Sequence, residues 1–432
     1  MKVALIQPNS PFLTDEKVFP NIGLIRVATQ LKYDGHKVDL FDYTGKKDIE
    51  IKNHIQKNAT KYDAYGFSST TPQFLYTTKI FNYLKDKNKD AYTILGGAHA
   101  SALYNLKQKG YKDFNIDDLE NFNTIFAGEG ELDNVDLMFK NGWQKGKLIK
   151  NIDDVLEPDR SLIDEESYHY NLFGKDTLSI QTQRGCPFDC AFCCGRDIEM
   201  YNKVRQHSPE RVLKEMDDLH EKYGRSSFMW YDDEININMN RLEKLCVALS
   251  KRNYQHRGFI RSDQIVKHPE SVEWMKKAGF VKLCTGVESG SDNMLKKVNK
   301  KTTSEMNYEA RKIIKKNKIH YESFLMLGFP GEGRGDVLKT INWIKNAKPD
   351  DYDVNIITPY PGSKIYDEAV PSTTFKNYKW EFNGMFFNKP RYSKEDSFYK
   401  GIDAQSESNV RTTYITNKEL KKTRDLIDRR FK

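Results

Sequence analysis

Short apolar runs alternate with amphipathic segments over the first 132 residues of the chain. Between the runs, apolar residues recur at helical spacing, as over residues 24–33 and 73–85. This alternation predicts a doubly wound, Rossmann-like parallel sheet with helices on its faces. Five runs have the length and composition of buried parallel strands: residues 3–7, 37–41, 64–68, 92–95 and 124–127.

The loops that follow three of these runs are rich in glycine and hydroxyl groups: residues 68–71, 96–97 and 128–131. Doubly wound sheets bind ligands beyond the carboxyl ends of their strands, where these loops lie. Glycine lets a large ligand approach the backbone closely. The pattern therefore predicts a ligand site at this edge of the sheet.

A second alternation begins at residue 178 and predicts six strand–helix units. Ser208 and Pro209 mark the start of one helix and Gly224 its end. Six units are too few for a closed eight-stranded barrel, so we expect an open, partial one with its chemistry at the carboxyl ends of the strands. The expected strands are residues 178–183, 227–231, 258–262, 281–287, 323–327 and 353–358.

The fold class is therefore α/β, and the chain divides into four expected parts. Residues 1–132 form the Rossmann-like domain, 133–177 a connector, 178–365 a partial (β/α)6 barrel and 366–432 a small C-terminal subdomain. The last part has no clear period and carries aromatic residues that we expect to be exposed: Trp380, Phe382, Phe386, Phe387 and Tyr392.

Composition narrows the class of protein. Among 432 residues there are 24 Tyr, 24 Phe and only six Cys, so packing rather than a disulfide framework is expected to hold the fold. The N-terminal apolar run is too short for a signal peptide, and no run reaches the ~18 apolar residues of a membrane span. We therefore expect a cytoplasmic protein that does not enter a membrane.

The net charge of +8 comes mostly from residues 411–432, which carry eight Lys/Arg against three Asp/Glu. A solvated basic helix explains such a tail, so nucleic acid is not the favoured partner.

Four of the six cysteines fall within nine residues, directly after the first predicted barrel strand. Core packing does not cluster cysteines in this way, whereas thiolates bind iron–sulfur clusters and zinc. Zinc sites need four ligands that commonly arrive as two separated pairs, and the chain has no second cysteine pair. Three cysteines on a four-iron cluster would leave one iron open for a ligand. The four are Cys186, Cys190, Cys193 and Cys194.

The spacing Cys-x3-Cys-x2-Cys, with Phe192 before the last cysteine, resembles the signature of the radical S-adenosylmethionine (SAM) superfamily. The resemblance implies that Cys186, Cys190 and Cys193 hold a [4Fe-4S] cluster that binds SAM and cleaves it to a 5′-deoxyadenosyl radical. By the family pattern Cys194 is not a ligand.

Further motifs follow the later strands in the family's order, so that the match runs from about residue 178 to 363. Residues 230–234 stand where the family has a Gly-Gly-Glu-like element for the SAM ammonium, residues 286–291 resemble its ribose and amino-acid contact, and residues 327–332 resemble the loop that supports adenine. A solvated acidic turn remains the alternative for residues 232–234, and an ordinary ion pair for Arg261. The implied SAM contacts are Phe192, Asp232, Asp233, Glu234, Arg261, Glu288, Ser289, Gly328 and Pro330.

Residues 1–132 resemble the cobalamin-binding domain that precedes the barrel in one branch of this superfamily. One element departs from other cobalamin proteins: the chain lacks the Asp-x-His-x-x-Gly loop whose histidine binds cobalt, so we expect no protein imidazole on the lower face of the corrin. A minority of this branch keeps the domain without cobalamin. The implied cobalamin contacts are Ser69, Thr70, Gly96, Gly97, Gly128 and Glu129.

Together the resemblances imply a cobalamin-dependent radical SAM enzyme that methylates an unactivated carbon. A cobalamin-using cyclase or ring-rearranging enzyme is the alternative, as is a radical SAM enzyme whose Rossmann-like domain no longer binds cobalamin. The expected partners are a small-molecule or peptide substrate and an electron donor such as flavodoxin or ferredoxin. The sequence assigns no catalytic side chain and does not identify the substrate.

Overall fold

The computed structural model describes residues 1–11, 13–111, 119–394 and 409–431, and the chain forms two compact units. Unit 1 comprises residues 1–169 with 197–200 and the described part of 389–406; unit 2 comprises residues 170–196, 201–388 and the described part of 407–432. The four-part division of the chain stays a prediction. None of the described helices is long and apolar enough to cross a membrane.

Unit 1 is built on a six-stranded parallel sheet, which confirms the predicted doubly wound class. Its strand order, β2-β1-β3-β4-β5-β6, reverses direction between β1 and β3, the place where such sheets open a crevice for a ligand. The sixth strand lies in the segment expected to be a connector. The strands are β1 (Lys2–Gln7), β2 (Lys37–Asp42), β3 (Ala64–Ser68), β4 (Tyr92–Gly96), β5 (Thr124–Ala127) and β6 (Gly142–Lys145).

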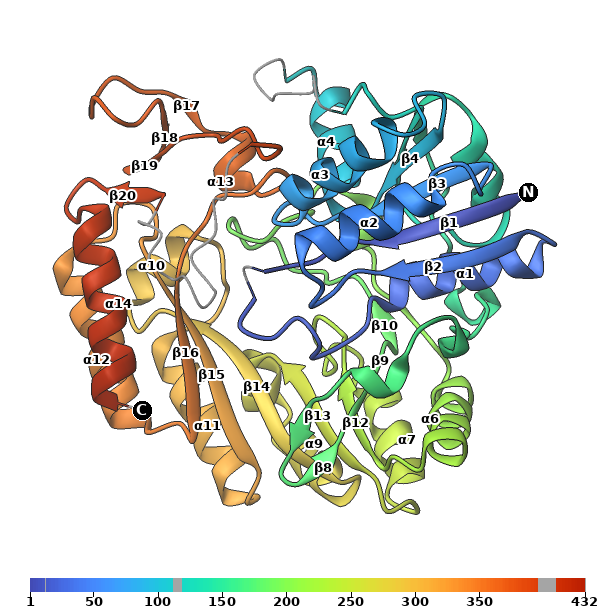
Figure 1. The fold of residues 1–432 in the computed structure, drawn as a ribbon. Helices are drawn as coiled ribbons and strands as arrows, with labels where there is room; N and C mark the ends of the chain where they lie inside the picture. Colours follow the sequence, from blue (N-terminus) through green and yellow to red (C-terminus); the bar gives the residue numbers. More distant parts are fainter. Residues whose placement is uncertain (12, 112–118, 395–408, 432) are drawn as a thin grey trace. The chain divides into compact units, whose positions relative to one another are not determined.

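Helices cover both faces of this sheet (Figure 1). Helix α1 and the 3-10 segment η1 bury Leu24 and Val135 against Val3 and Leu5 of β1, whereas α3 packs Phe81 against Phe67 of β3. The helices are α1 (Ile22–Tyr33), α2 (Asp48–Asn58), α3 (Phe74–Lys85) and α4 (Ala98–Gln108), followed by η1 (Leu132–Phe139), η2 (Ile152–Asp154), η3 (Arg160–Leu162) and η4 (Glu165–Ser167).

Unit 2 contains a second six-stranded parallel sheet, in which the strands follow one another in chain order (Figure 1). Sequential parallel strands with intervening helices form the predicted partial barrel. The first strand ends early, and Gln183–Arg184 instead forms the short strand β10, which pairs with β11 (Arg205–Gln206). The sheet contains β9 (Leu178–Ile180), β12 (Ser227–Trp230), β13 (Gln255–Ile260), β14 (Phe280–Glu288), β15 (His320–Leu327) and β16 (Asp351–Ile356).

The helices of unit 2 begin and end at sequence signals. In α6, the Ser208 side chain accepts a hydrogen bond from the Arg211 amide, and Gly224 closes the helix in the left-handed conformation. The helices are α6 (Pro209–Tyr223), α7 (Met239–Leu249), α8 (Ser262–Lys267), α9 (Glu270–Lys277), α10 (Asp292–Lys297), α11 (Ser304–Lys316), α12 (Arg334–Ala347) and α13 (Lys364–Asp367), and a short helix, α5 (Glu199–Asn202), precedes them.

The two faces of the second sheet differ in exposure. Along β15 and β16, every second side chain is buried and the intervening ones are partly exposed. On the buried face, the Tyr352 hydroxyl donates to the backbone of Ile427 in the C-terminal helix, so this face lies under helices. The partly exposed side chains therefore line the inside of the curved sheet.

The C-terminal segment is a small antiparallel sheet followed by a helix. Phe386 and Phe387 were expected to be exposed but are only 2% and 1% exposed, and Tyr392, in unit 1, is 8% exposed. In the small sheet, β19 lies between two strands and packs one face against α13, where the ring centroids of Phe387 and Tyr366 are 6.4 Å apart. The elements are β17 (Val370–Pro371), β18 (Trp380–Phe382), β19 (Met385–Phe387), β20 (Val410–Thr412) and α14 (Asn417–Phe431); a separate hairpin pairs β7 (Asn171–Leu172) with β8 (Lys175–Asp176).

Candidate functional site

The cysteine loop, residues 185–196, runs between β10 and β11 and is tied to the rest of unit 2 by backbone hydrogen bonds. The Ala191 amide donates to the Val298 carbonyl over 2.9 Å, and the Cys186 amide donates to the Tyr201 carbonyl over 3.0 Å. Gly185 has a φ of +82°, and a Cβ atom there would lie 2.2 Å from the Lys203 carbonyl oxygen. Glycine is therefore required where the loop begins.

The three thiols of Cys186, Cys190 and Cys193 lie near one another, and burial raises the pKa of each, to about 12 for Cys193. Buried thiols of this kind give up their protons when a metal is bound. Among the described residues, no three His, Cys, Asp or Glu side chains converge on a single ion. A cluster binds each thiolate to a different iron atom, so three neighbouring thiols on one loop fit it.

Arg196 is a functional candidate that the sequence analysis missed. Its Nη1 atom donates to the Cys186 carbonyl over 2.9 Å, and its charge acts on Cys186, Cys190 and Cys193. It therefore both braces the cysteine loop and places a cation beside the thiols. Its position three residues after Cys193 is the sequence feature that could have identified it as part of the site.

Cys194 differs from its three neighbours. The residue has exposed surface, yet enough protein surrounds its thiol to raise the pKa to about 12, and the nearby charges include Asp367 and Arg196. Of the remaining cysteines, Cys246 and Cys284 are buried at 2% and 0% exposure.

The three carboxylates after β12 have different surroundings. Asp232 is buried, and its carboxylate accepts hydrogen bonds from the Thr182 and Gln183 amides and from the Thr182 hydroxyl. This carboxylate therefore joins the ends of β9 and β12. Asp233 has exposed surface and lies near Arg196.

Glu234 has no such internal role. Its Oε2 atom is buried without a hydrogen-bond partner, and burial raises the pKa of the carboxyl to about 8. Lys300 and Arg261 are the cations whose charges act on it. A buried carboxylate oxygen without a partner fits an incoming ammonium group.

Lys300 connects several parts of this site, although sequence reasoning missed it. Its Nζ atom lies 2.9 Å from Glu288 Oε1, and its carbonyl accepts a hydrogen bond from Arg261 Nη2 over 2.8 Å. Burial opposes its charge while Glu288, Cys190 and Glu234 favour it, and the pKa of Lys300 rises. It lies in a lysine-rich loop whose sequence resembles a solvated turn.

Arg261 directly follows β13 and lies against the cysteine loop. Its guanidinium is 3.5 Å from the ring centroid of Phe188 and donates from Nε to Asp263 Oδ1 over 2.8 Å. The predicted residues Cys190, Glu234, Arg261 and Glu288 are thus brought together with Lys300 at the carboxyl ends of the strands.

The end of β14 has an unusual backbone. Glu288 has a φ of +64°, in the left-handed region, next to an irregularity in the pairing with β15. A Cβ atom on Gly286 would lie 2.3 Å from Glu288 Oε1 and 2.8 Å from Lys300 Nζ. Glycine thus leaves room for this ion pair. Ser289 is fully buried, its hydroxyl within 3.2 Å of that of Thr340.

The loop after β15 is held from within and from the C-terminal segment. Glu332 accepts a hydrogen bond from the Gly328 amide, and burial raises the pKa of its carboxyl to about 8. The Thr412 hydroxyl donates to the Glu332 carbonyl over 2.7 Å. Phe192 of the cysteine loop meets Phe329 of this loop, with ring centroids 5.9 Å apart. Pro330 lies between these contacts in the chain, at the turn.

In unit 1, the loops predicted to bind cobalamin form a polar edge. The Ser69 hydroxyl donates to the Thr70 carbonyl over 3.0 Å, Thr70 itself is exposed, and Glu129 Oε2 accepts from the Ile149 amide over 3.0 Å. Gly97 has a φ of +90°, and a Cβ atom there would lie 2.7 Å from the Ser69 carbonyl oxygen. Gly97 is therefore needed for packing between two loops.

Other polar side chains extend this edge, at the place where the strand order reverses. Asn21 donates to Gln7 over 2.7 Å and to Ser68 over 3.2 Å, and Gln73 donates to Ser10 over 2.8 Å. These amide and hydroxyl groups, with the partly exposed Gly96 and Gly128 nearby along the same edge, fit a ligand fringed with amides.

His99 is 1% exposed and lies in the first turn of α4. Its Nδ1 atom shares a hydrogen bond with the Thr71 hydroxyl at 3.1 Å, and its ring lies 4.4 Å from that of Phe74. Burial lowers its pKa to about 3, so the imidazole is neutral.

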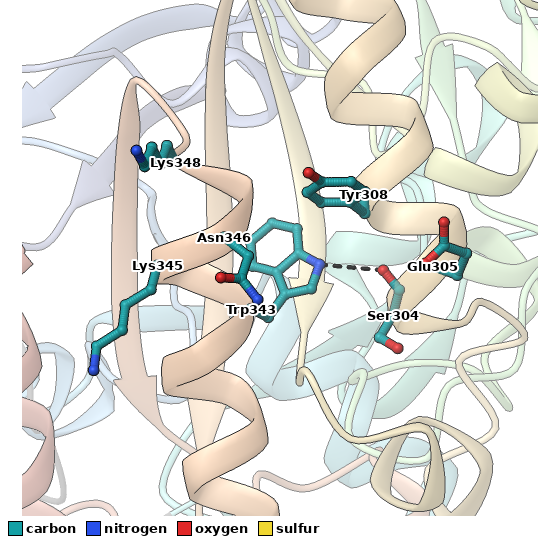
Figure 2. Close-up of a pocket in the computed structure, with 7 residues that line it drawn as sticks. All are labelled: Ser304, Glu305, Tyr308, Trp343, Lys345, Asn346 and Lys348. Carbon is teal, nitrogen blue, oxygen red and sulfur yellow. Dashed lines mark hydrogen bonds between the residues drawn. The ribbon is translucent and has the colours of Figure 1, made fainter.

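A pocket of about 510 Å³ lies on the outer side of unit 2, between α11 and α12 (Figure 2). Trp343 and Tyr308 form its wall, and the Trp343 indole donates to the Ser304 carbonyl over 3.2 Å. None of its lining residues belongs to the predicted site.

Two family models match the chain. The radical SAM superfamily model matches residues 180–344, and the B12 binding domain model matches residues 12–117. The first of these spans the cysteine loop and the ends of β12–β15. The chain therefore contains a radical SAM domain and a B12-binding domain.

Relatives of this radical SAM enzyme match over most of its length. An uncharacterized methyltransferase of Pyrococcus horikoshii is 26% identical over 88% of this chain and 85% of its own. An anaerobic magnesium-protoporphyrin IX monomethyl ester cyclase of Rubrivivax gelatinosus is 26% identical over 85% and 70%. The structure of the cobalamin-dependent radical SAM enzyme OxsB, with aqua-cobalamin and SAM bound, superposes with a TM-score of 0.63 at 19% identity. That match covers 85% of this chain but 55% of OxsB, and it shows a shared fold.

The radical SAM domain implies a [4Fe-4S] cluster and SAM as cofactors, and the B12-binding domain supports cobalamin as the third. The residue assignments remain predictions, which the variants below test.

The first prediction concerns the cluster ligands. Replacement of Cys186, Cys190 or Cys193 by Ala should remove the iron and sulfide from anaerobically reconstituted protein, because each thiolate binds a separate iron. Iron and sulfide analysis with the absorbance of the cluster measures this. Cys194→Ala serves as the matched control and should retain the cluster. Loss of iron in that variant would show that Cys194 is a ligand.

The second prediction separates Asp232 from Glu234. Asp232→Ala should lower the free energy of unfolding by about 1–3 kcal/mol or more, because it leaves buried amide and hydroxyl donors without a partner. Glu234→Gln should leave the unfolding free energy nearly unchanged but weaken SAM binding at least tenfold, since a charged hydrogen bond contributes roughly 1.5–3 kcal/mol. Chemical denaturation and equilibrium dialysis with labelled SAM measure the two effects. Unchanged SAM affinity in Glu234→Gln would contradict the assignment.

Proposed function

We propose that the chain is a cobalamin-dependent radical SAM methyltransferase that methylates an unactivated carbon. The observation that carries this proposal is the presence, in one chain, of a cysteine loop beside a charged SAM-type site and of a B12-type sheet. A relative named as a methyltransferase, which aligns over most of both chains, supports methylation.

When bound, the cofactors supply electron transfer to SAM, formation of a carbon radical and a cobalt-borne methyl group. The chain's own residues position these groups. We assign Cys186, Cys190 and Cys193 to the cluster, with Arg196 bracing their loop through the Cys186 carbonyl.

We assign the charged group beside the cysteine loop to the amino-acid end of SAM. Glu234 presents a buried oxygen without a partner and suits the SAM ammonium. Lys300 and Arg261 are the cations that suit its carboxylate, and the Lys300–Glu288 ion pair holds the first of them in place. Of the three adjacent carboxylates at residues 232–234, this assignment selects Glu234 as the contact of the SAM ammonium.

We assign Phe192 and the loop of Gly328 and Pro330 to the adenine end of SAM. Phe329 of this loop packs against Phe192.

In unit 1, the proposed cobalamin contacts are Ser69, Thr70, Gly96, Gly97, Gly128 and Glu129. The exposed Thr70 hydroxyl donates to Gln73 over 2.9 Å and can still accept a hydrogen bond, so this oxygen and the glycine backbones are the groups best placed to meet a ligand. The enclosed, neutral His99 is tied to Thr71, and we expect no imidazole on the lower face of the corrin.

A cyclase is the second candidate function, because a cyclase relative aligns over 85% of this chain. The two reactions share the radical step and differ in whether a methyl group reaches the product. Either reaction requires an electron donor, for which we propose a flavodoxin or ferredoxin, and a substrate.

The third prediction separates these reactions by their products. Reconstituted, cobalamin-loaded protein with reductant, trideuteromethyl-SAM and a small-molecule extract of the expressing cells should release 5′-deoxyadenosine, methionine and S-adenosylhomocysteine. The released methionine keeps the label of SAM in either reaction, so mass spectrometry should look for a further compound that has gained a trideuteromethyl group. A cyclase would release 5′-deoxyadenosine and labelled methionine, but no newly trideuteromethylated compound. Cys190→Ala is the control and should release none of these products. Protein that loses hydroxocobalamin on gel filtration would contradict the methyltransferase.

A further inference from the structure

On the inner face of the second sheet, a layer of apolar side chains lies between two layers of charged side chains. One charged layer is the group assigned to SAM, and the other lies at the opposite end of the strands. Phe259 of β13 and Met326 of β15 each lie two residues before the loops assigned to SAM, which begin at Arg261 and Gly328. A strand rises about 3.3 Å per residue, so the apolar layer begins roughly 7 Å below those loops. It therefore lies within reach of a radical formed at the SAM site.

Two rings form the centre of this layer. The ring centroids of Phe259 and Phe324 are 5.7 Å apart at an interplanar angle of 36°, although β14 separates their strands. Gly286 is the partner of Phe324 in β14, so this strand places no side chain beside Phe324 at that level of the sheet. Both rings and Met326 are partly exposed, whereas Leu325 between them is fully buried. The layer thus presents apolar surface that the described residues do not cover.

The charged layer beneath is neutralised from within. Arg257 donates to Glu322 over 2.9 Å, and Lys282 lies 3.1 Å from Glu322 and 3.3 Å from Asp351. Two cations thus face two carboxylates, and Cys284 donates a further hydrogen bond to Glu322 over 3.1 Å. Arg257 and Lys282 are each 8% exposed. Little charge is left here to attract an ionic group.

A small polar region adjoins the apolar layer, and we call the two together the wall. On the edge strand β16, Asn355 donates to Asp353 over 3.3 Å, and both face the inside of the sheet. A ligand on this wall would meet two rings, a thioether and one polar pair.

We propose that Phe259, Phe324 and Met326 bind a flat, uncharged apolar ring system in the substrate. This proposal rests on the proposed function, because it names the substrate class for the same site. Aromatic rings favour stacked or edge-on contacts with flat π systems, and Met adapts to irregular apolar shapes. Phosphate-rich substrates do not match a wall whose neighbouring cations are already paired.

The fourth prediction tests this wall with two probes that share one skeleton. N-phenyl-1-naphthylamine is uncharged, and 1-anilinonaphthalene-8-sulfonate carries an added sulfonate. Equilibrium dialysis with cluster-reconstituted protein should show tighter binding of the uncharged probe. Phe324→Ala and Phe259→Ala should each weaken its binding about tenfold or more, as loss of a buried aromatic side chain predicts. Iron content verifies that each variant retains its cluster.

Matched variants distinguish this wall from other apolar surfaces. Tyr308→Ala, in the outer pocket of Figure 2, should leave probe binding unchanged. Met326→Gln keeps the length of the side chain but adds an amide, and should weaken binding if the alanine variants fail to fold. Equal binding of both probes, or loss of binding in Tyr308→Ala alone, would overturn the proposal. The proposed function would survive that result, because its test follows products and not probe binding.

Discussion

The burial of mutually dependent charges at the end of the second sheet is the constraint on which the site depends. Glu234, Glu288, Lys300 and Arg261 lie together beside the thiols of the cysteine loop. Isolated burial would be costly for any of these ions, and only Glu288 and Lys300 form a close mutual pair within the group. Glu234 keeps a buried oxygen without a partner, which is the position that the proposed function assigns to the ammonium group of SAM.

Much of the surrounding structure serves to hold this group. Asp232 ties β9 to β12 and so fixes where the cysteine loop begins, while residues 298–300 meet that loop and Arg261. Glu288 adopts a left-handed conformation, of a kind that costs on the order of 1–3 kcal/mol in sparsely populated backbone regions. In this conformation Glu288 forms its ion pair with Lys300, in the space that a side chain at Gly286 would otherwise occupy. The Thr412 hydroxyl also stabilises the loop after β15, because it donates a hydrogen bond to the Glu332 carbonyl.

The elements with a strong period were predictable from the sequence, because strand and helix spacing is a local property of the chain. Both parallel sheets belong to this class, and the cysteine loop was recognisable from the spacing of its cysteines, which is also local. β6 was missed because Gly142–Lys145 has only one apolar residue and half-exposed or exposed side chains. Phe386 and Phe387 were expected to be exposed because their neighbours lack a period, yet the small sheet and α13 bury them.

Within the site, residue type identified the chemistry but not the role of each side chain. Asp232, Asp233 and Glu234 are adjacent carboxylates in the sequence, and only their contacts distinguish the structural Asp232 from the unpartnered Glu234. Lys300 is surrounded by lysines in sequence, and its burial depends on contacts with residues far away in the chain. Long-range packing of this kind leaves no local pattern to read.

The most direct measurement of the central claim is electron–nuclear double resonance of the reduced cluster with SAM labelled with nitrogen-15 at its amino group. If Cys186, Cys190 and Cys193 leave one iron open beside Glu234, the spectrum should show coupling between the cluster and the labelled nitrogen. A reduced four-iron cluster that shows no such coupling, although SAM is bound, would contradict the account.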